Sequence, residues 1–203
     1  MKIVAVHGSA RRNSSSIRAA RDLVNELKSD DAEVKEYFTS DMNIKSCKCC
    51  FACRKKEICT IQNDDMDILY QDIITADLTV FSSPLFMGDV SGSFKLMLDR
   101  LYPPFFCDGP PGRYTPRHPG MKCVFVFAQG APAMVTGSAD KQIMRRLPVM
   151  GFDVLGILHE TLTVNIDDLT ESKLARKGMR FLKHWDQKKN RRKIAAIKKS
   201  WIG

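Results

Sequence analysis

The chain has 203 residues, of which 44% are hydrophobic and 27% are charged. This composition is typical of one globular domain with a buried core, and it excludes an intrinsically disordered chain. The net charge of +9 is concentrated near the C-terminus, because residues 187–203 hold seven Lys or Arg and no acid. We therefore interpret 187–203 as a basic, solvated C-terminal tail and expect no nucleic-acid partner, although RNA, an anionic membrane face or an acidic protein could also contact such a tail.

The N-terminus predicts a cytoplasmic protein. Its apolar run covers only residues 3–6, which is shorter than the roughly 7 to 15 residues of a secretory signal. No window approaches the ~18 apolar residues of a membrane span, so we expect none. In a reducing cytosol, a dense group of cysteines is more often metal-binding or catalytic than a disulfide framework.

Short apolar runs alternate with segments of helical spacing along the chain. The runs predict strands at residues 2–6, 32–38, 78–83, 122–129 and 152–158. Helices are expected at 17–27, from about 65, at 94–101 behind a possible N-cap at Ser91, and at 174–185. This order predicts a doubly wound α/β domain with a five-stranded parallel sheet and helices on both faces. Ligands of such domains bind at the carboxyl ends of the strands.

The loop after the first strand, "HGSARRNSSS", predicts a phosphate site. It combines hydroxyls and arginine with the start of a helix, whose free N–H groups attract anions. The alternative is a Ser-rich loop that only caps its helix. The fingerprints of Rossmann dinucleotide sites and P-loops are absent here, and a hydroxyl-rich loop resembles the way in which flavodoxins hold the phosphate of FMN. The candidate residues are Ser9, Arg11, Asn13, Ser14, Ser15 and Ser16.

Two later loops are candidates for holding a flat ring. After the third strand, apolar residues and a glycine that permits close approach of the backbone suit an isoalloxazine, or else belong to the core or to an interface. These residues are Pro84, Leu85, Phe86, Met87 and Gly88. The corresponding loop after the fourth strand contains Ala128, Gln129 and Gly130.

Five of the seven cysteines lie within "SCKCCFACRKKEIC". Cys47, Cys50, Cys53 and Cys59 have the spacing C-x2-C-x2-C-x5-C, close to the compact patterns that wrap a [4Fe–4S] cluster. A zinc site and a metal-free thiol loop are the alternatives. Cys49 has no place in the pattern. The acids of "NDDMD" are expected to cap the following helix.

The stretches "HGSARRNSSS", "CKCCFACRKKEICTIQNDDM" and "ADLTVFSSPLFMGDVSGSFKLMLDRLYP" together resemble the NADPH-dependent FMN reductase family, in its iron–sulfur flavoprotein branch. The resemblance is close over residues 1 to about 103. It implies a flavodoxin-like fold, a homodimer or homotetramer, and FMN held by the first two loops, with Ser9, Arg11 and Ser16 at phosphate positions. The family's third loop is commonly Thr-Gly-Gly, so the contacts of 128–130 stay open.

We therefore predict a flavodoxin-like FMN-binding domain at 1–186, with an inserted cysteine loop at 45–60 and a Pro-rich loop at 102–121, followed by the tail. The predicted function is FMN-dependent oxidoreduction, with a [4Fe–4S] cluster passing electrons to a ferredoxin-type partner and NAD(P)H as a possible donor. No protein side chain is expected to act as acid or base. The alternatives are a cluster-free NAD(P)H:FMN or quinone reductase, and a redox-sensing or regulatory module.

Overall fold

Five parallel strands form the centre of the molecule in the computed structural model, which describes residues 1–56, 58–102, 116–132, 134, 137–164, 167 and 172–202. Their order is β2-β1-β3-β5-β6, and a short β4 pairs antiparallel with the end of β3. The strands are β1 (Lys2–His7), β2 (Glu33–Phe38), β3 (Leu78–Phe86), β4 (Asp89–Val90), β5 (Met121–Ala128) and β6 (Phe152–Glu160). The predicted five-stranded parallel sheet is confirmed, and this strand order is that of flavodoxin-like folds.

The strand order reverses beside β1, because the chain moves from β1 to β2 on one side and then to β3 on the other. The register places Ile3 opposite Val34 of β2 and Leu78 of β3. The loops that leave β1 and β3 therefore open next to each other at the carboxyl edge. Open α/β sheets bind their ligands at this kind of position.

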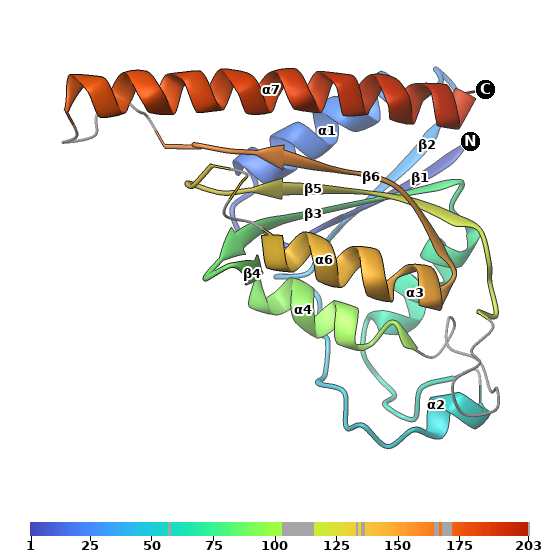
Figure 1. Cartoon of the computed structure of the whole chain (residues 1–203). Helices are drawn as coiled ribbons and strands as arrows, with labels where there is room; N and C mark the ends of the chain where they lie inside the picture. The colour runs from blue at the N-terminus through green and yellow to red at the C-terminus, as the bar shows by residue number, and fades with distance from the viewer. Residues whose placement is uncertain are drawn as a thin grey trace.

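Helices cover both faces of the sheet (Figure 1). Helices α1 and α7 lie on one face, and α3, α4 and α6 lie on the other. Successive strand residues point to opposite faces, so Ile3 and Ala5 pack towards α1 while Val4 and Val6 pack with the second layer. The helices are α1 (Ser15–Leu27), α2 (Ala52–Lys55), α3 (Met66–Thr75), α4 (Gly92–Asp99), α6 (Gly137–Arg146) and α7 (Lys173–Ile202), with a 3-10 turn η2 (Pro148–Met150).

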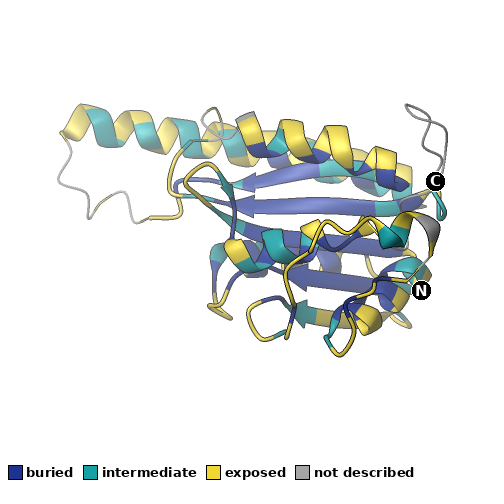
Figure 2. Ribbon diagram, turned by 90° about the horizontal axis from the view of Figure 1, so that it is seen from below, coloured by how far each residue is buried: buried dark blue, intermediate teal, exposed yellow. Residues whose placement is uncertain are grey.

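Helix α7 is longer than the predicted 174–185, since it continues through the basic segment. Ile197 is 1% exposed and packs against β6, where a Cβ on Gly156 would lie 2.8 Å from its Cδ1 atom. Ile194 and Trp201 pack against the same apolar cluster. The described part of 187–203 is thus a docked helix rather than a solvated extension, with an exposed outer surface (Figure 2). No helix in the described ranges is long and apolar enough to cross a membrane.

The two inserted segments differ in how much of each the structure describes. Of the Pro-rich loop at 102–121, residues 103–115 lie outside them. The cysteine stretch is described except for residue 57, and it extends away from the sheet to the short helix α2 (Figure 1). It therefore stands apart from the layered domain, next to α3 and α4.

Candidate functional site

The loop after β1 presents buried hydroxyls at the start of α1. Ser14 is the N-cap residue, and its Oγ accepts a hydrogen bond from the Ile17 amide at 3.4 Å. Ser16 is fully buried, with its Oγ 3.2 Å from that of Ser14. The first turn of α1 holds no acidic side chain, so its positive end is not neutralised from within. This arrangement suits an anion such as a phosphate.

The other residues of this loop are held by local contacts. Ser9 Oγ accepts the Arg11 amide at 3.2 Å, and Arg18 donates to the Asn13 carbonyl at 2.7 Å and to Ser15 Oγ at 3.4 Å. Arg12 lies over the Phe38 ring and pairs with Asp41. Arg11 is exposed, and its side chain has no partner among the described residues. Arg11 is therefore the arginine available for a bound anion.

Ser91 joins this loop to α4, the helix that follows residues 84–88, the candidate ring loop. It does not cap α4 through its side chain, as its position had suggested, but donates from Oγ to the Gly8 carbonyl at 2.5 Å. Gly8 lies so near that a Cβ on it would be 2.8 Å from Ser91 Oγ. The first two loops are therefore fixed against each other.

The loop after β3 is a tight hairpin that displays apolar side chains. Leu85 pairs with Val90, and Phe86 pairs with Asp89, across a turn in which Met87 and Gly88 have φ of 51° and 81°. Phe86 is 64% exposed and Met87 is fully exposed. Ser138 donates from Oγ to the Gly88 carbonyl at 2.9 Å and so ties the turn to α6. The hairpin presents an apolar surface at the carboxyl edge, on which a flat ring could rest.

The loop after β5 completes the same edge. Ala128 is buried at the end of the strand, and Gly130 is exposed. The Gln129 side chain is turned towards its own loop, where its Nε2 atom donates to the carbonyls of Ala131 at 3.0 Å and Pro132 at 2.8 Å. The structure thus brings the three predicted loops together at adjacent strand ends, but the Gln129 amide faces its own backbone.

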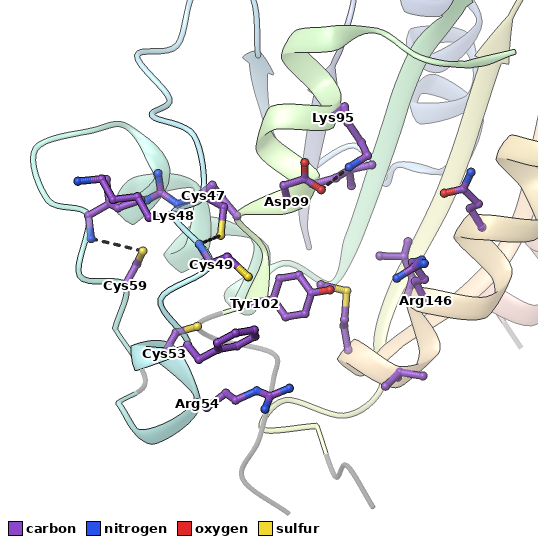
Figure 3. A pocket seen from close by; sticks show the side chains of 18 of the residues that line it. Cys47, Lys48, Cys49, Cys53, Arg54, Cys59, Lys95, Asp99, Tyr102 and Arg146 are labelled. Carbon is purple, nitrogen blue, oxygen red and sulfur yellow. Dashed lines mark hydrogen bonds and ion pairs between the residues drawn. The ribbon is translucent and has the colours of Figure 1, made fainter. Parts of the chain in front are cut away.

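The five clustered cysteines line one cavity of about 740 Å³ between the cysteine stretch, α4 and α6. Figure 3 shows Cys47, Cys49, Cys53 and Cys59 on one side, Arg146 of α6 on the other, and Tyr102 between them. The same cavity reaches Asp89 and Val90 of β4, beside the ring loop. The cavity therefore extends from the cysteines to the ring loop.

Hydrogen bonds to sulfur occur at three of these thiols. The Cys49 amide donates to Cys47 Sγ, the Ile61 amide donates to Cys59 Sγ, and Cys50 Sγ contacts Thr60 Oγ1, each at 3.4 Å. The Thr60 hydroxyl lowers the pKa of Cys50. Burial, with the nearby Cys59 and Cys50 thiols, raises the pKa of Cys53.

The thiol set fits a sulfur-ligated metal group in its chemistry. Soft thiolates select iron–sulfur clusters or zinc, and backbone N–H groups that donate to ligand sulfurs are a recognised means of tuning such clusters. Cys47, Cys49 and Cys50 are exposed, Cys53 is half-buried and Cys59 is buried. Among the described residues, no three Cys, His, Asp or Glu side chains converge as a metal site. The donors thus share a cavity without enclosing one point in it.

Arg100, which the sequence did not single out, lies under the cysteine stretch. Its guanidinium is 1% exposed and donates to Asp64 at 2.6 and 3.3 Å and to the Lys45 carbonyl at 2.7 Å. Burial alone would lower the pKa of Arg100, but its hydrogen bonds to Asp64 outweigh this and raise it. Of the acids of "NDDMD" that were expected to cap α3, the N-cap residue Asp65 makes no side-chain cap bond, whereas Asp64 accepts the Met66 amide at 3.2 Å and also pairs with this buried arginine. The two lie far apart in sequence, so no local pattern could have paired them.

A comparison with protein families matches residues 1–147 to the NADPH-dependent FMN reductase family. The chain belongs to this family. Curated relatives include iron–sulfur flavoproteins of Methanocaldococcus jannaschii, 34% identical over 100 residues, and of Methanosarcina thermophila, 31% identical over 100 residues. These alignments cover 49% of this chain and 50% and 52% of the two relatives, so they span about half of each protein.

Solved structures support the fold of this FMN reductase family member. An azoreductase of Bacillus anthracis aligns with a TM-score of 0.66 and 14% identity, covering 98% of this chain and 99% of the other. An FMN-dependent NADH-azoreductase of the same species, in complex with FMN, aligns with a TM-score of 0.61 and 13% identity, covering 93% and 99%. At such low identity these likenesses establish the flavodoxin-like fold alone.

Proposed function

We propose that the protein is an FMN-dependent oxidoreductase that binds FMN at the three loops of the carboxyl edge and a [4Fe–4S] cluster at the cysteine stretch. The observation that carries the proposal is the start of α1, where buried Ser14 and Ser16 stand beside the ring loop at the reversal of strand order. Membership of the FMN reductase family over residues 1–147 supports the choice of flavin. The names of the iron–sulfur flavoprotein relatives support the choice of cluster.

The residues after β1 would hold the phosphate of FMN. The free N–H groups of the first turn of α1 and the hydroxyls of Ser9, Ser14 and Ser16 supply donors, and Arg11 supplies a positive charge. Asn13 and Ser15 shape the loop through their bonds with Arg18. Because Gly8 and Ser91 fix this loop to α4, phosphate and ring would be held at a fixed separation.

The second and third loops would hold the flavin ring. Pro84, Leu85, Phe86, Met87 and Gly88 form the hairpin whose apolar side chains would cover one side of the ring. Ala128, Gln129 and Gly130 would lie at its edge, with backbone groups as the donors because the Gln129 amide is engaged elsewhere. No acid or base from the protein is required. When bound, FMN accepts a hydride or single electrons, and the cluster passes electrons one at a time.

Cys47, Cys50, Cys53 and Cys59 would ligate the cluster. The amides that donate to Cys47 and Cys59 would stabilise negative sulfur, and the cavity gives the cysteines access towards the ring loop. Exposed Lys48, Arg54 and Lys56 surround the stretch, which suits an acidic ferredoxin-type partner. NAD(P)H is the proposed donor, and the proposed assembly is a homodimer or homotetramer.

A cluster-free NAD(P)H:FMN or quinone reductase is the second candidate. It is favoured by the observation that the described cysteines do not converge on one point. Such an enzyme would use the three flavin loops in the same way and would keep free thiols at the cysteine stretch.

The flavin site is tested by comparing the binding of FMN and riboflavin, which differ only in the phosphate. Titration of the flavin-free chain, followed by quenching of flavin fluorescence, should give tighter binding of FMN than of riboflavin by at least about a hundredfold, because a phosphate at a helix N-terminus makes several charge-assisted bonds. Bound FMN should then be bleached by NADPH or NADH under anaerobic conditions. Equal affinity for the two flavins would contradict the phosphate site.

A further inference from the structure

Arg100 closes the base of the cysteine stretch. It donates to the Lys45 carbonyl, where the chain enters the loop, at 2.7 Å. It also donates to the Asp64 carboxylate, where the chain leaves the loop, at 2.6 Å. Asp64 in turn accepts the Lys45 amide at 3.2 Å and the Met66 amide at 3.2 Å. One buried side chain therefore joins both ends of the segment that contains all five clustered cysteines.

Further bonds lock this base. Asn43 and Asp65 exchange two hydrogen bonds, from the Asn43 amide to Asp65 Oδ2 at 2.7 Å and from the Asp65 amide to the Asn43 carbonyl at 3.0 Å. Lys45 Nζ donates to the Gln62 carbonyl at 2.9 Å. The Tyr70 hydroxyl donates to the Arg100 carbonyl at 2.5 Å and holds the end of α4 against α3. The base is thus held by several hydrogen bonds, whereas three of the five cysteines beyond it are exposed.

One donor of Arg100 is left over. Its Nε–H is buried and has no hydrogen-bond partner among the described residues, although the terminal nitrogens are bonded to Asp64 and Lys45. A buried N–H without an acceptor is costly, and native structures rarely keep one. Arg100 and Cys59 line the same cavity. Arg100 thus lines the cavity that also holds the thiols, and it carries one buried donor without a partner among the described residues.

We propose that Arg100 is a positioning residue that fixes both ends of the cysteine loop and supplies its Nε–H and its positive charge to the sulfur-ligated group held by that loop. The second half of this inference rests on the proposed cluster, and the first half does not. A positive charge and a hydrogen bond at the sulfurs both favour the reduced, more negative state of a cluster. Arg100 would therefore raise its reduction potential.

Two substitutions separate the positioning role of Arg100 from its donor role. Arg100→Lys keeps a buried positive charge that can reach Asp64, but it removes the Nε–H and the planar fork. Arg100→Met removes the positive charge and all of the guanidinium donors. It leaves the Asp64 carboxylate without its cationic partner. Lys95→Met is the matched control, because Lys95 lies on α4, which ends just before Arg100, and lines the same cavity, yet among the described residues its side chain bonds only to the exposed Asp99. Bound FMN and far-UV circular dichroism report whether each variant is folded.

The test measures three quantities on the full chain, namely the midpoint potential of the iron–sulfur signal, iron retained after gel filtration, and the rate at which iodoacetamide modifies Cys59 in iron-free protein. We expect Arg100→Lys to lower the potential while Cys59 stays protected. Arg100→Met should lower it further, lose at least half of the iron and label Cys59 more than tenfold faster, and Lys95→Met should match the unmodified protein in all three quantities. If Arg100→Met does not fold, Asp64→Asn replaces it in the labelling assay, where it should speed modification of Cys59.

The outcomes distinguish failure of this inference from failure of the proposed function. An unmodified protein that retains no iron after anaerobic purification and reconstitution overturns both the cluster and the donor role, and labelling of Cys59 then decides the positioning role alone. If iron is bound, but Arg100→Lys leaves the potential unchanged, the donor role is wrong. If Arg100→Met labels Cys59 at the rate of the unmodified protein, the positioning role is wrong as well.

Discussion

Gly8 and Phe94 lie in direct contact, such that a Cβ on Gly8 would stand 2.7 Å from the Cβ of Phe94. Since Phe94 is fully buried in the apolar cluster beneath the sheet, it has little room to move. The contact fixes the loop after β1, the candidate phosphate loop, on α4. The glycine is therefore required by space rather than by a left-handed backbone.

Gly8→Ala should destabilise the fold and weaken FMN binding together. The added methyl overlaps Phe94 and Ser91, and such overpacking costs about 1–3 kcal/mol. Chemical denaturation and FMN titration measure the two effects. Gly92→Ala is the control, because a Cβ at that position meets nothing within 4 Å. If Gly8→Ala bound FMN like the control, the close fit of loop and helix would not matter to the flavin.

Ser14→Ala should affect FMN more than riboflavin. The substitution removes the N-cap of α1, which costs about 1 kcal/mol of stability, and deletes one donor to a charged group, which corresponds to roughly tenfold in affinity. Flavin fluorescence titration gives both affinities. Ser29→Ala, beyond the other end of α1, should change neither. A parallel loss of both flavins in Ser14→Ala would mean that the hydroxyl supports the loop but does not contact the phosphate.

The fold was predictable because its central strands are continuous apolar runs, as "KIVAV" and "KCVFVFA" illustrate. Their burial on both faces requires a parallel sheet between helices, and the observed order agrees. The third strand runs on to Phe86 because its end pairs with the two-residue β4, which is too short to produce a pattern. The predicted helix ended at 185 because the basic charge of the following segment was given more weight than the apolar stripe of Ile194, Ile197 and Trp201, which packs on the sheet of the same chain.

The candidate site was predictable only where its residues lie within one short stretch of the sequence. The three candidate flavin loops follow strand ends, and each carries its own sequence signal. The pair of Arg100 and Asp64 carries no such sequence signal, because each residue alone is simply a charged residue near a helix terminus. Only folding brings the two into contact. The spacing of the cysteines could indicate a cluster but not the shared cavity that extends to β4.

Acid should destabilise the protein through Asp72, which ties α3 to the first two strands. Lys2 Nζ lies 2.6 Å and Lys35 Nζ 3.1 Å from its carboxylate, which also accepts the Tyr37 hydroxyl. Burial alone would raise the pKa of Asp72, but these bonds outweigh it and lower the pKa from 3.8 to about 2.

Because the folded pKa lies below the unfolded value, the stabilisation is complete above the unfolded pKa and is lost as pH falls towards 2. The shift corresponds to about 2 kcal/mol. Urea denaturation between pH 6 and 2 should therefore show a shallower decline for Asp72→Asn than for the unmodified protein. Asp99→Asn, in an exposed pair with Lys95, should follow the unmodified protein. Coincident slopes for all three proteins would show that Asp72 does not cause the loss of stability in acid.

His7 should add a second decline at milder pH. It is fully buried at the end of β1, with Nδ1 2.7 Å from Ser82 Oγ and Nε2 3.2 Å from Glu36. Burial lowers its pKa below 6.5, although Glu36 opposes this. The unfolded state then binds more protons below pH 6.5, so stability falls as pH drops through that value. The unfolding free energy of the unmodified protein should fall from pH 7 to 5 more than that of His7→Asn, and equal declines would contradict the prediction.

The composition of anaerobically purified protein tests the central claim most directly. Quantitation of flavin, iron and acid-labile sulfide should give about one FMN, about four iron and about four sulfide per chain, as a single [4Fe–4S] cluster beside one flavin requires. Substitution of Cys50 by serine should remove the iron and leave the FMN, whereas serine at the buried Cys123 should preserve both. FMN with iron near zero in the unmodified protein would contradict the cluster, and absence of FMN would contradict the account as a whole.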